Sequence, residues 1–244
     1  MKPIIIFSTT GIFCFMALIA CNGIGKKGNG HVTTQTRDIK PFNKVSIEGV
    51  FPVEVSQNGD SAFVKVETDE NLQEDITVEN NGSGLIIKTK EGASIRRSTK
   101  MKVYVNIKTL SELNFKSVGS LSTLDTLNLD SLDISSESVG KLNLNITAKY
   151  LHADLSSVGS TTLSGKVAEV RINNKSVGSL SAFDLKAGTL MIHNTAVGVT
   201  EVYADSAFYI RSSSVGALYY KGPGEVKELK SEGVGKVQKK TGDD

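Results

Sequence analysis

Seven polar side chains in the middle of the chain are of the types that bind sugars or transfer protons. Most come in pairs separated by one residue, and on a β-strand this spacing places both members on the same face. Guanidinium groups and carboxylates form strong charge-assisted hydrogen bonds, while imidazoles and carboxylates can act as general acids and bases. The set is His152, Asp154, Arg171, Asn173, His193, Tyr209 and Arg211. On one surface these side chains could bind a glycan or an acidic ligand.

An internal repeat determines how these residues are positioned. A Val-Gly pair, usually preceded by Ser, recurs seven times, and its intervals are 21, 19, 19, 20, 18 and 19 residues. Its glycines are Gly119, Gly140, Gly159, Gly178, Gly198, Gly216 and Gly235. A period this regular indicates stacked structural units, each of which cannot bury its apolar face alone.

Aligning the copies on the valine reveals apolar columns. The fifth residue before it is Leu113, Ile134, Ala153, Ile172, Ile192, Ile210 or Leu229, and the third residue after it is mostly Leu. Polar residues fill most places between, which is the period-two alternation of a strand. We therefore predict an all-β fold, a parallel right-handed β-helix with turns of about 19 residues. The glycines are expected at a corner, and the preceding serines in a hydrogen-bonded ladder beside it.

The register places the sixth and fourth residues before each valine on the outer face, and all seven candidate ligand residues occupy these positions. A solvated face whose charges only keep the sheet soluble is the alternative interpretation. Catalysis is not predicted, because Asp133 and Asp154, which come closest to a carboxylate pair, occupy different columns. The recurring serines have no histidine at a fixed offset.

Metal, cofactor and nucleic-acid functions lack the residues they require. The histidines His31, His152 and His193 have no cysteine partner and no second histidine four positions away, so no metal or cofactor is predicted. Without Lys2 the 28 basic residues become 27 against 26 acidic residues, and this balance gives no electrostatic case for binding nucleic acid.

Both ends of the chain differ from the repeats. Lys2, an apolar run over 4–20 and Ala20 before a cysteine have the form of a cleaved export signal over 1–20. The sequence Leu18-Ile19-Ala20-Cys21 resembles the lipobox of bacterial lipoproteins, and this resemblance implies acylation of Cys21. We expect a flexible tether over 21–36, a capping β region over 37–108, solenoid repeats over 109–237 and a frayed tail over 238–244.

The stretch from Pro41 to Gln57 (PFNKVSIEGVFPVEVSQ), followed by Val64-Lys-Val-Glu and the Ser-Val-Gly turns, resembles the auto-transporter adhesin family called the head GIN domain. The resemblance covers roughly 37–237. It implies a parallel β-helical envelope lipoprotein, common in Bacteroidetes-type bacteria, with no established enzymatic activity. Fold alone does not define function.

Together these features predict a non-enzymatic, adhesin-like binding or structural protein of the cell envelope. We expect an outer-membrane lipoprotein on the periplasmic side or at the surface, held by lipid on Cys21, with a glycan or an envelope protein as ligand. The alternative is a polysaccharide lyase or hydrolase that uses the outward face of the middle turns, since long parallel β-helices also carry such enzymes.

Overall fold

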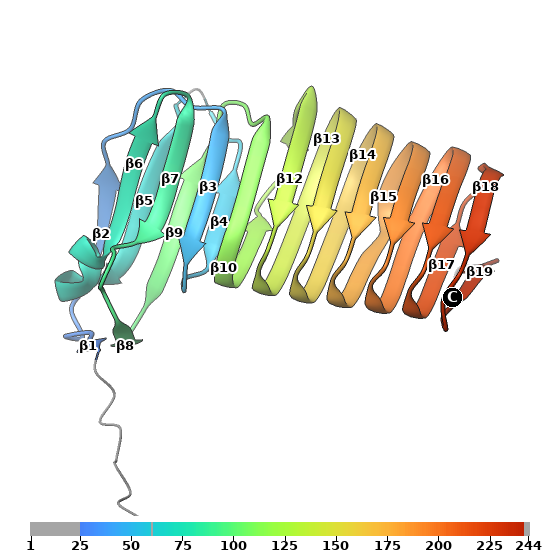
Figure 1. Ribbon diagram of the computed structural model, residues 1–244. Helices are drawn as coiled ribbons and strands as arrows, with labels where there is room; N and C mark the ends of the chain where they lie inside the picture. Colours follow the sequence, from blue (N-terminus) through green and yellow to red (C-terminus); the bar gives the residue numbers. More distant parts are fainter. Residues whose placement is uncertain (1–24, 60, 242–244) are drawn as a thin grey trace, which may run out of the picture.

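The structure is a computed structural model that describes residues 25–59 and 61–241. The predicted signal segment and Cys21 lie outside the described residues. Figure 1 shows an N-terminal group of strands that continues into a long coil. The N-terminal elements are β1 (Lys26–Lys27), β2 (Val32–Arg37), β3 (Lys44–Gly49), β4 (Val53–Ser56), β5 (Phe63–Asp69), the 3-10 helix η1 (Glu70–Asp75), β6 (Ile76–Asn81), β7 (Gly84–Thr89), β8 (Ile95–Arg97) and β9 (Met101–Asn106).

The coil is a parallel β-solenoid of about seven turns with about 19 residues each, so the predicted fold class is confirmed. Each long strand pairs in parallel with its equivalent in the next turn, for example Val139 with Val158 and Val158 with Val177. The solenoid strands are β10 (Glu112–Thr123), β11 (Leu127–Asn128), β12 (Ser131–Ser136), β13 (Val139–Leu155), β14 (Val158–Asn174), β15 (Val177–Asn194), β16 (Val197–Ser212), β17 (Val215–Lys221), β18 (Glu225–Ser231) and β19 (Lys236–Lys239).

The predicted interior columns form the core of the solenoid. Ile172, Ile192 and Ile210 are aligned in successive strands, and each is at most 3% exposed. The column ends at the last turn, where Leu229 is 44% exposed because no further turn covers it. Stacked aliphatic side chains thus supply most of the burial that holds the turns together.

The recurring Ser-Val-Gly corner is built as the sequence predicts. Gly178 has a φ of +138°, and a Cβ at this position would overlap the carbonyl oxygen of Gly159 in the preceding turn. The hydroxyl oxygens of Ser136, Ser138 and Ser157 lie 2.9–3.2 Å from one another inside the corner. The predicted serine ladder is therefore confirmed there, and Asn174 and Asn194 extend it with a hydrogen bond of 3.0 Å.

Differences in turn length are absorbed away from the corner. The register between β14 and β15 shifts between Thr162 and Gly165, and that between β15 and β16 shifts twice between Ala182 and Thr189. The pairing from Glu169 with Thr189 to Asn174 with Asn194 is unbroken. The outward columns before the corner consequently stay aligned from turn to turn.

The N-terminal region covers the first turn, as expected. Strands β3 and β4 both pair in parallel with β10. Beyond them, β5 pairs antiparallel with β9 and β2 pairs antiparallel with β5, while β6 pairs antiparallel with β7. This arrangement covers the edge strands of the first turn, which would otherwise be free to pair with another chain.

The tether and the tail are shorter than the sequence predicts. Lys26 pairs with Ile95 of β8 and forms an ion pair of 2.7 Å with the buried carboxylate of Asp75, so this part of 21–36 belongs to the folded body. Strand β2 does too. At the other end, β19 pairs with β17 rather than fraying. In the described ranges, no helix is both long and apolar enough to cross a membrane.

Candidate ligand-binding face

The seven candidate residues lie in β13–β16 on one outward surface, which we call the ligand face. Two parallel columns supply them. His152, Arg171 and Tyr209 belong to one column, with Met191 between Arg171 and Tyr209; Asp154, Asn173, His193 and Arg211 form the other. None of the seven is buried, so the predicted outward orientation is confirmed for all of them. Neighbours within a column are one strand spacing apart, about 4.8 Å.

His152 is the centre of a small polar cluster. Its Nδ1 lies 3.3 Å from Asp133 Oδ1, and its Nε2 lies 3.6 Å from Asp154 Oδ1. The amide of Asn173 donates a hydrogen bond of 2.7 Å to the same Asp154 oxygen. The two carboxylates that the sequence assigns to different columns thus flank one imidazole, because the side chains lean across the strands.

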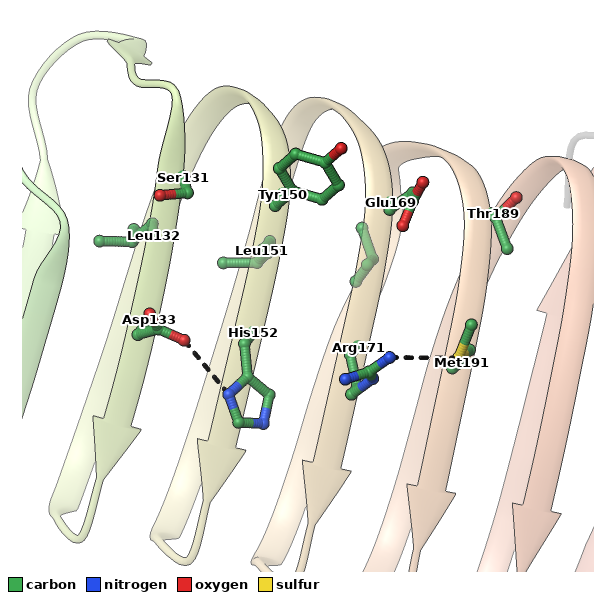
Figure 2. A pocket seen from close by; sticks show the side chains of 11 residues that line it. Ser131, Leu132, Asp133, Tyr150, Leu151, His152, Glu169, Arg171, Thr189 and Met191 are labelled. Carbon is green, nitrogen blue, oxygen red and sulfur yellow. Dashed lines mark hydrogen bonds and ion pairs between the residues drawn. The ribbon is translucent and has the colours of Figure 1, made fainter.

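A shallow groove of about 160 Å³ is lined by His152 and Asp133 of this cluster (Figure 2). Figure 2 shows a lower row of Asp133, His152, Arg171 and Met191, with a dashed contact at each end of the row. Ser131, Tyr150, Glu169 and Thr189 form an upper row near the turns. Tyr150 is 54% exposed as a residue, so its side chain is accessible to a ligand.

A second groove of about 310 Å³ continues the ligand face towards the C-terminal turns. It shares Arg171 and Met191 with the first groove and adds His193, Tyr209 and Arg211. Arg211 donates hydrogen bonds of 2.8 and 3.3 Å to the two carboxylate oxygens of Glu228. This contact raises the pKa of Arg211, and Arg211 followed by Lys230 holds the pKa of the Glu228 carboxyl below its usual range.

The arrangement offers imidazole, guanidinium, amide and carboxylate groups that can hydrogen-bond a ligand. Within residues 25–59 and 61–241, no group of three or more His, Cys, Asp or Glu side chains is placed to hold a metal ion. In the same ranges the side-chain partners of His152 are Asp133, Asp154 and Asn173, and none of these is a hydroxyl that it could activate as a nucleophile.

The grooves are also lined by Asp133 and Glu228, which belong to a predicted outward column but not to the candidate set, and by Tyr150 and Glu169, which the predicted columns do not include. Tyr150 and Glu169 stand eight residues before their valines, one alternation further out than the two columns considered. The same period-two rule identifies them once it is extended by one step.

The sequence pattern of a known family, described as "Putative auto-transporter adhesin, head GIN domain", matches residues 41–224. This chain belongs to that family. The match covers β3 to β17 and the turn after it, and therefore includes the whole ligand face. None of the curated proteins matches the chain.

Solved structures share the fold of this chain. A "putative adhesin" from Bacteroides fragilis is 25% identical, with a TM-score of 0.83 over 88% of this chain and 100% of the other. A "putative adhesin" from Parabacteroides distasonis is 26% identical, with a TM-score of 0.64 and coverage of 87% and 98%. A "putative lipid binding protein" from the same species, 23% identical with a TM-score of 0.65, covers 88% and 99% and shows the fold alone.

Proposed function

We propose that this head GIN protein is a non-enzymatic binding protein of the cell envelope that retains a glycan along its ligand face. The observation that carries the proposal is the continuity of the two grooves, which share Arg171 and Met191. A ligand lying across β12–β16 would meet equivalent side-chain positions at each strand spacing of about 4.8 Å. Such a surface suits a polymer of repeating units better than a compact small molecule.

The side chains fit the chemistry of sugars. Tyr150 and Tyr209 offer aromatic faces for the apolar side of a pyranose ring, and their amphipathic rings combine contact area with a hydrogen-bonding hydroxyl. Asp133, Asn173 and Arg171 supply planar acceptors and donors for vicinal hydroxyls or sugar carboxylates. The adhesin-like character of the family agrees with retention rather than turnover.

Membrane attachment through Cys21 completes the proposed role. The export signal and the Leu18 to Cys21 motif support a lipoprotein, and several acyl chains would make the attachment stable. We place the protein in the outer membrane, because Asn22 follows the cysteine where an aspartate tends to retain lipoproteins of enteric bacteria at the inner membrane.

Binding to immobilised envelope and host glycans tests the ligand face. We expect the double variant Tyr150→Ala/Arg171→Ala to lose retention of any glycan that the parent protein binds. Tyr203→Ala/Lys186→Ala is a matched control, because Lys186 stacks on the Tyr203 ring in a separate groove that shares no residue with the ligand face. Equal retention by both variants would contradict the proposed site.

Product analysis in the same experiment separates binding from catalysis. A retained glycan should be recovered with its original chain length after long incubation. Shortened or unsaturated products that depend on His152 would instead support the lyase or hydrolase alternative. If the protein retains an envelope protein but no glycan, the ligand face would still be the binding site, but its ligand would be a protein.

A further inference from the structure

The valines of the Ser-Val-Gly corners form an exposed apolar line along one edge of the solenoid. Each is aligned with the valine of the next turn, from Val118 to Val215. Val50 extends the line, because the flanking pairs Gly49 with Ser117 and Val53 with Leu121 have the same offset. We call this set the valine ridge: Val50, Val118, Val139, Val158, Val177, Val197 and Val215, each between 47% and 57% exposed.

The ridge is unusual for a soluble surface. Exposed apolar residues are normally scattered, whereas these follow one another at every strand spacing over roughly 29 Å at ~4.8 Å per strand. Strand propensity alone does not demand valine at an outward position of these turns. Two residues before the ridge, the same turns carry Lys116, Glu137, Ser156, Lys175, Thr195 and Ser213. The recurrence of valine at this outward position therefore indicates that an apolar surface covers this edge of the solenoid.

The beginning of the chain reaches the same edge. A groove of about 480 Å³ is lined by Val50, Val118 and Val139 together with Ala93 and Ile95. Ile95 belongs to β8, which pairs with Lys26 in β1. In Figure 1, β1 and β8 lie at the lower edge, where the short connections after β12–β15 also lie. Cys21 precedes Lys26 by five residues, a span of at most about 18 Å.

Basic side chains lie beside this end of the ridge, whose groove is also lined by Lys116 and Glu137. Lys27, Arg96 and Arg97 are all exposed on the β1–β8 pair. Basic residues close to an anchoring point are attracted to the anionic headgroups of a membrane surface. Apolar residues flanked by basic residues are the composition expected of a surface that lies in a membrane interface.

We propose that the valine ridge rests on the lipid bilayer, so that the solenoid lies along the membrane on its corner edge rather than standing away from it. The inference rests on the proposed attachment at Cys21, which brings the first ridge residues close to the membrane. The ligand face, on the strands that lead into these corners, is then turned sideways to the membrane.

Tryptophan fluorescence tests this contact without a label, because the chain contains no tryptophan. Val158→Trp places an indole on the ridge. Ala168→Trp is the matched control, since Ala168 is an exposed residue of the same strand beside Glu169, which Figure 2 shows near the upper turn. Both proteins are examined on anionic vesicles whose acyl chains carry bromine, which quenches indole emission on contact.

The proteins are attached in two ways, so that the anchor and the ridge are tested separately. One preparation uses protein purified from membranes after expression of the full chain. The other uses the chain beginning at Cys21, whose single cysteine is coupled to a maleimide lipid. The coupled protein could be quenched while the expressed protein is not quenched and carries no acyl group. That result would reject natural anchoring at Cys21 but would support contact between the valine ridge and the bilayer.

We expect Val158→Trp to lose roughly half of its emission on brominated vesicles, since interfacial apolar faces lie about 5–10 Å deep, and Ala168→Trp to lose little. Adding Val139→Asp and Val177→Asp should restore the emission of Val158→Trp. If bromine quenches both tryptophans to the same extent when the proteins are coupled to vesicles, the proposal is overturned. Shielding of Val158→Trp from aqueous iodide without quenching by bromine also overturns it, and would indicate that a second copy covers the ridge.

Discussion

Ile192 and His193 are consecutive residues of β15 whose side chains lie on opposite sides of the sheet. Ile192 is 3% exposed inside the coil, whereas His193 is exposed on the ligand face. Ile192→Ala should lower the free energy of unfolding by about 2–5 kcal/mol through lost burial and the remaining cavity. His193→Ala should stay within about 0.5 kcal/mol. Denaturant titration of both variants measures the difference, and equal tolerance would contradict the register.

Gly178 occupies a backbone position where a side chain would be both strained and sterically blocked. Gly178→Val should cost more than about 4 kcal/mol, because it combines positive φ with overlap onto the Gly159 carbonyl. Gly92→Ala serves as the control, since Gly92 also has positive φ but no atom within 4 Å of its Cβ position. That variant should cost only about 1–2 kcal/mol. Thermal unfolding would refute the close-approach argument if the two losses were alike.

These two positions illustrate how much of the fold can be read from the sequence. Period-two alternation repeated over seven copies predicts which side chains are buried, and the recurring glycine predicts the corner. The short strand at Lys26 could not be predicted, because its Gly-rich surroundings have the composition of a linker. Its folding depends on Ile95 and Asp75, which lie far away in the sequence.

The sequence predicts which residues of the ligand face point outward, but it does not predict which of their side chains contact one another. Alternation predicts that Asp133 and His152 point outward, but it carries no information about the direction in which their side chains lean. The contact between His152 and both Asp133 and Asp154 depends on rotamers, which are set by the neighbours in adjacent turns. Tyr150 belongs to a third outward column, which the two columns predicted from the sequence do not include.

Asn174 is a buried member of the corner network. It is 1% exposed, donates to Asn194 Oδ1 and Thr200 Oγ1, and accepts from the backbone N–H of Ser176. Asn174→Ala should cost about 1–3 kcal/mol, because it leaves buried partners without a hydrogen bond. Asn173→Ala, at the adjacent outward position, is the control and should change stability by less than about 0.5 kcal/mol. Urea denaturation measures the free energy of unfolding of both variants. A larger loss of stability for Asn173→Ala would contradict the assignment of Asn174 as the buried member of the network.

Asp69 makes the N-terminal region sensitive to acid. Burial raises the pKa of this carboxyl, but hydrogen bonds from the backbone N–H groups of Thr99 and Gly30, each 2.7 Å long, outweigh burial and leave its pKa below the ordinary value. Its stabilising effect is therefore present above about pH 4 and is lost as the pH falls through the folded-state pKa. Melting temperatures measured during acidification should fall more steeply for the parent protein than for Asp69→Asn. Parallel curves would show that Asp69 does not contribute.

Cys21→Ser should be exported without acquiring lipid. Metabolic labelling with a fatty acid is expected to mark the parent protein and to leave the variant unlabelled, because the variant lacks the thiol at position 21 that the lipobox motif presents. Fractionation should then recover the variant from the soluble phase. Label on Cys21→Ser would mean that the lipobox interpretation is wrong.

The register shift between β16 and β18, at Phe208 and Tyr209, falls inside the ligand face, whereas the shifts at 162–165 and 182–189 precede the strand segments that carry it in β14 and β15. A turn can therefore gain or lose a residue there without displacing the outward columns of its neighbours. Duplication or deletion of a whole turn would likewise lengthen or shorten the groove by one strand spacing, about 4.8 Å, and leave the existing subsites unchanged. On the proposed function, the number of turns would set the length of ligand that the groove accommodates, so that copying one module would change this length without rebuilding the pocket.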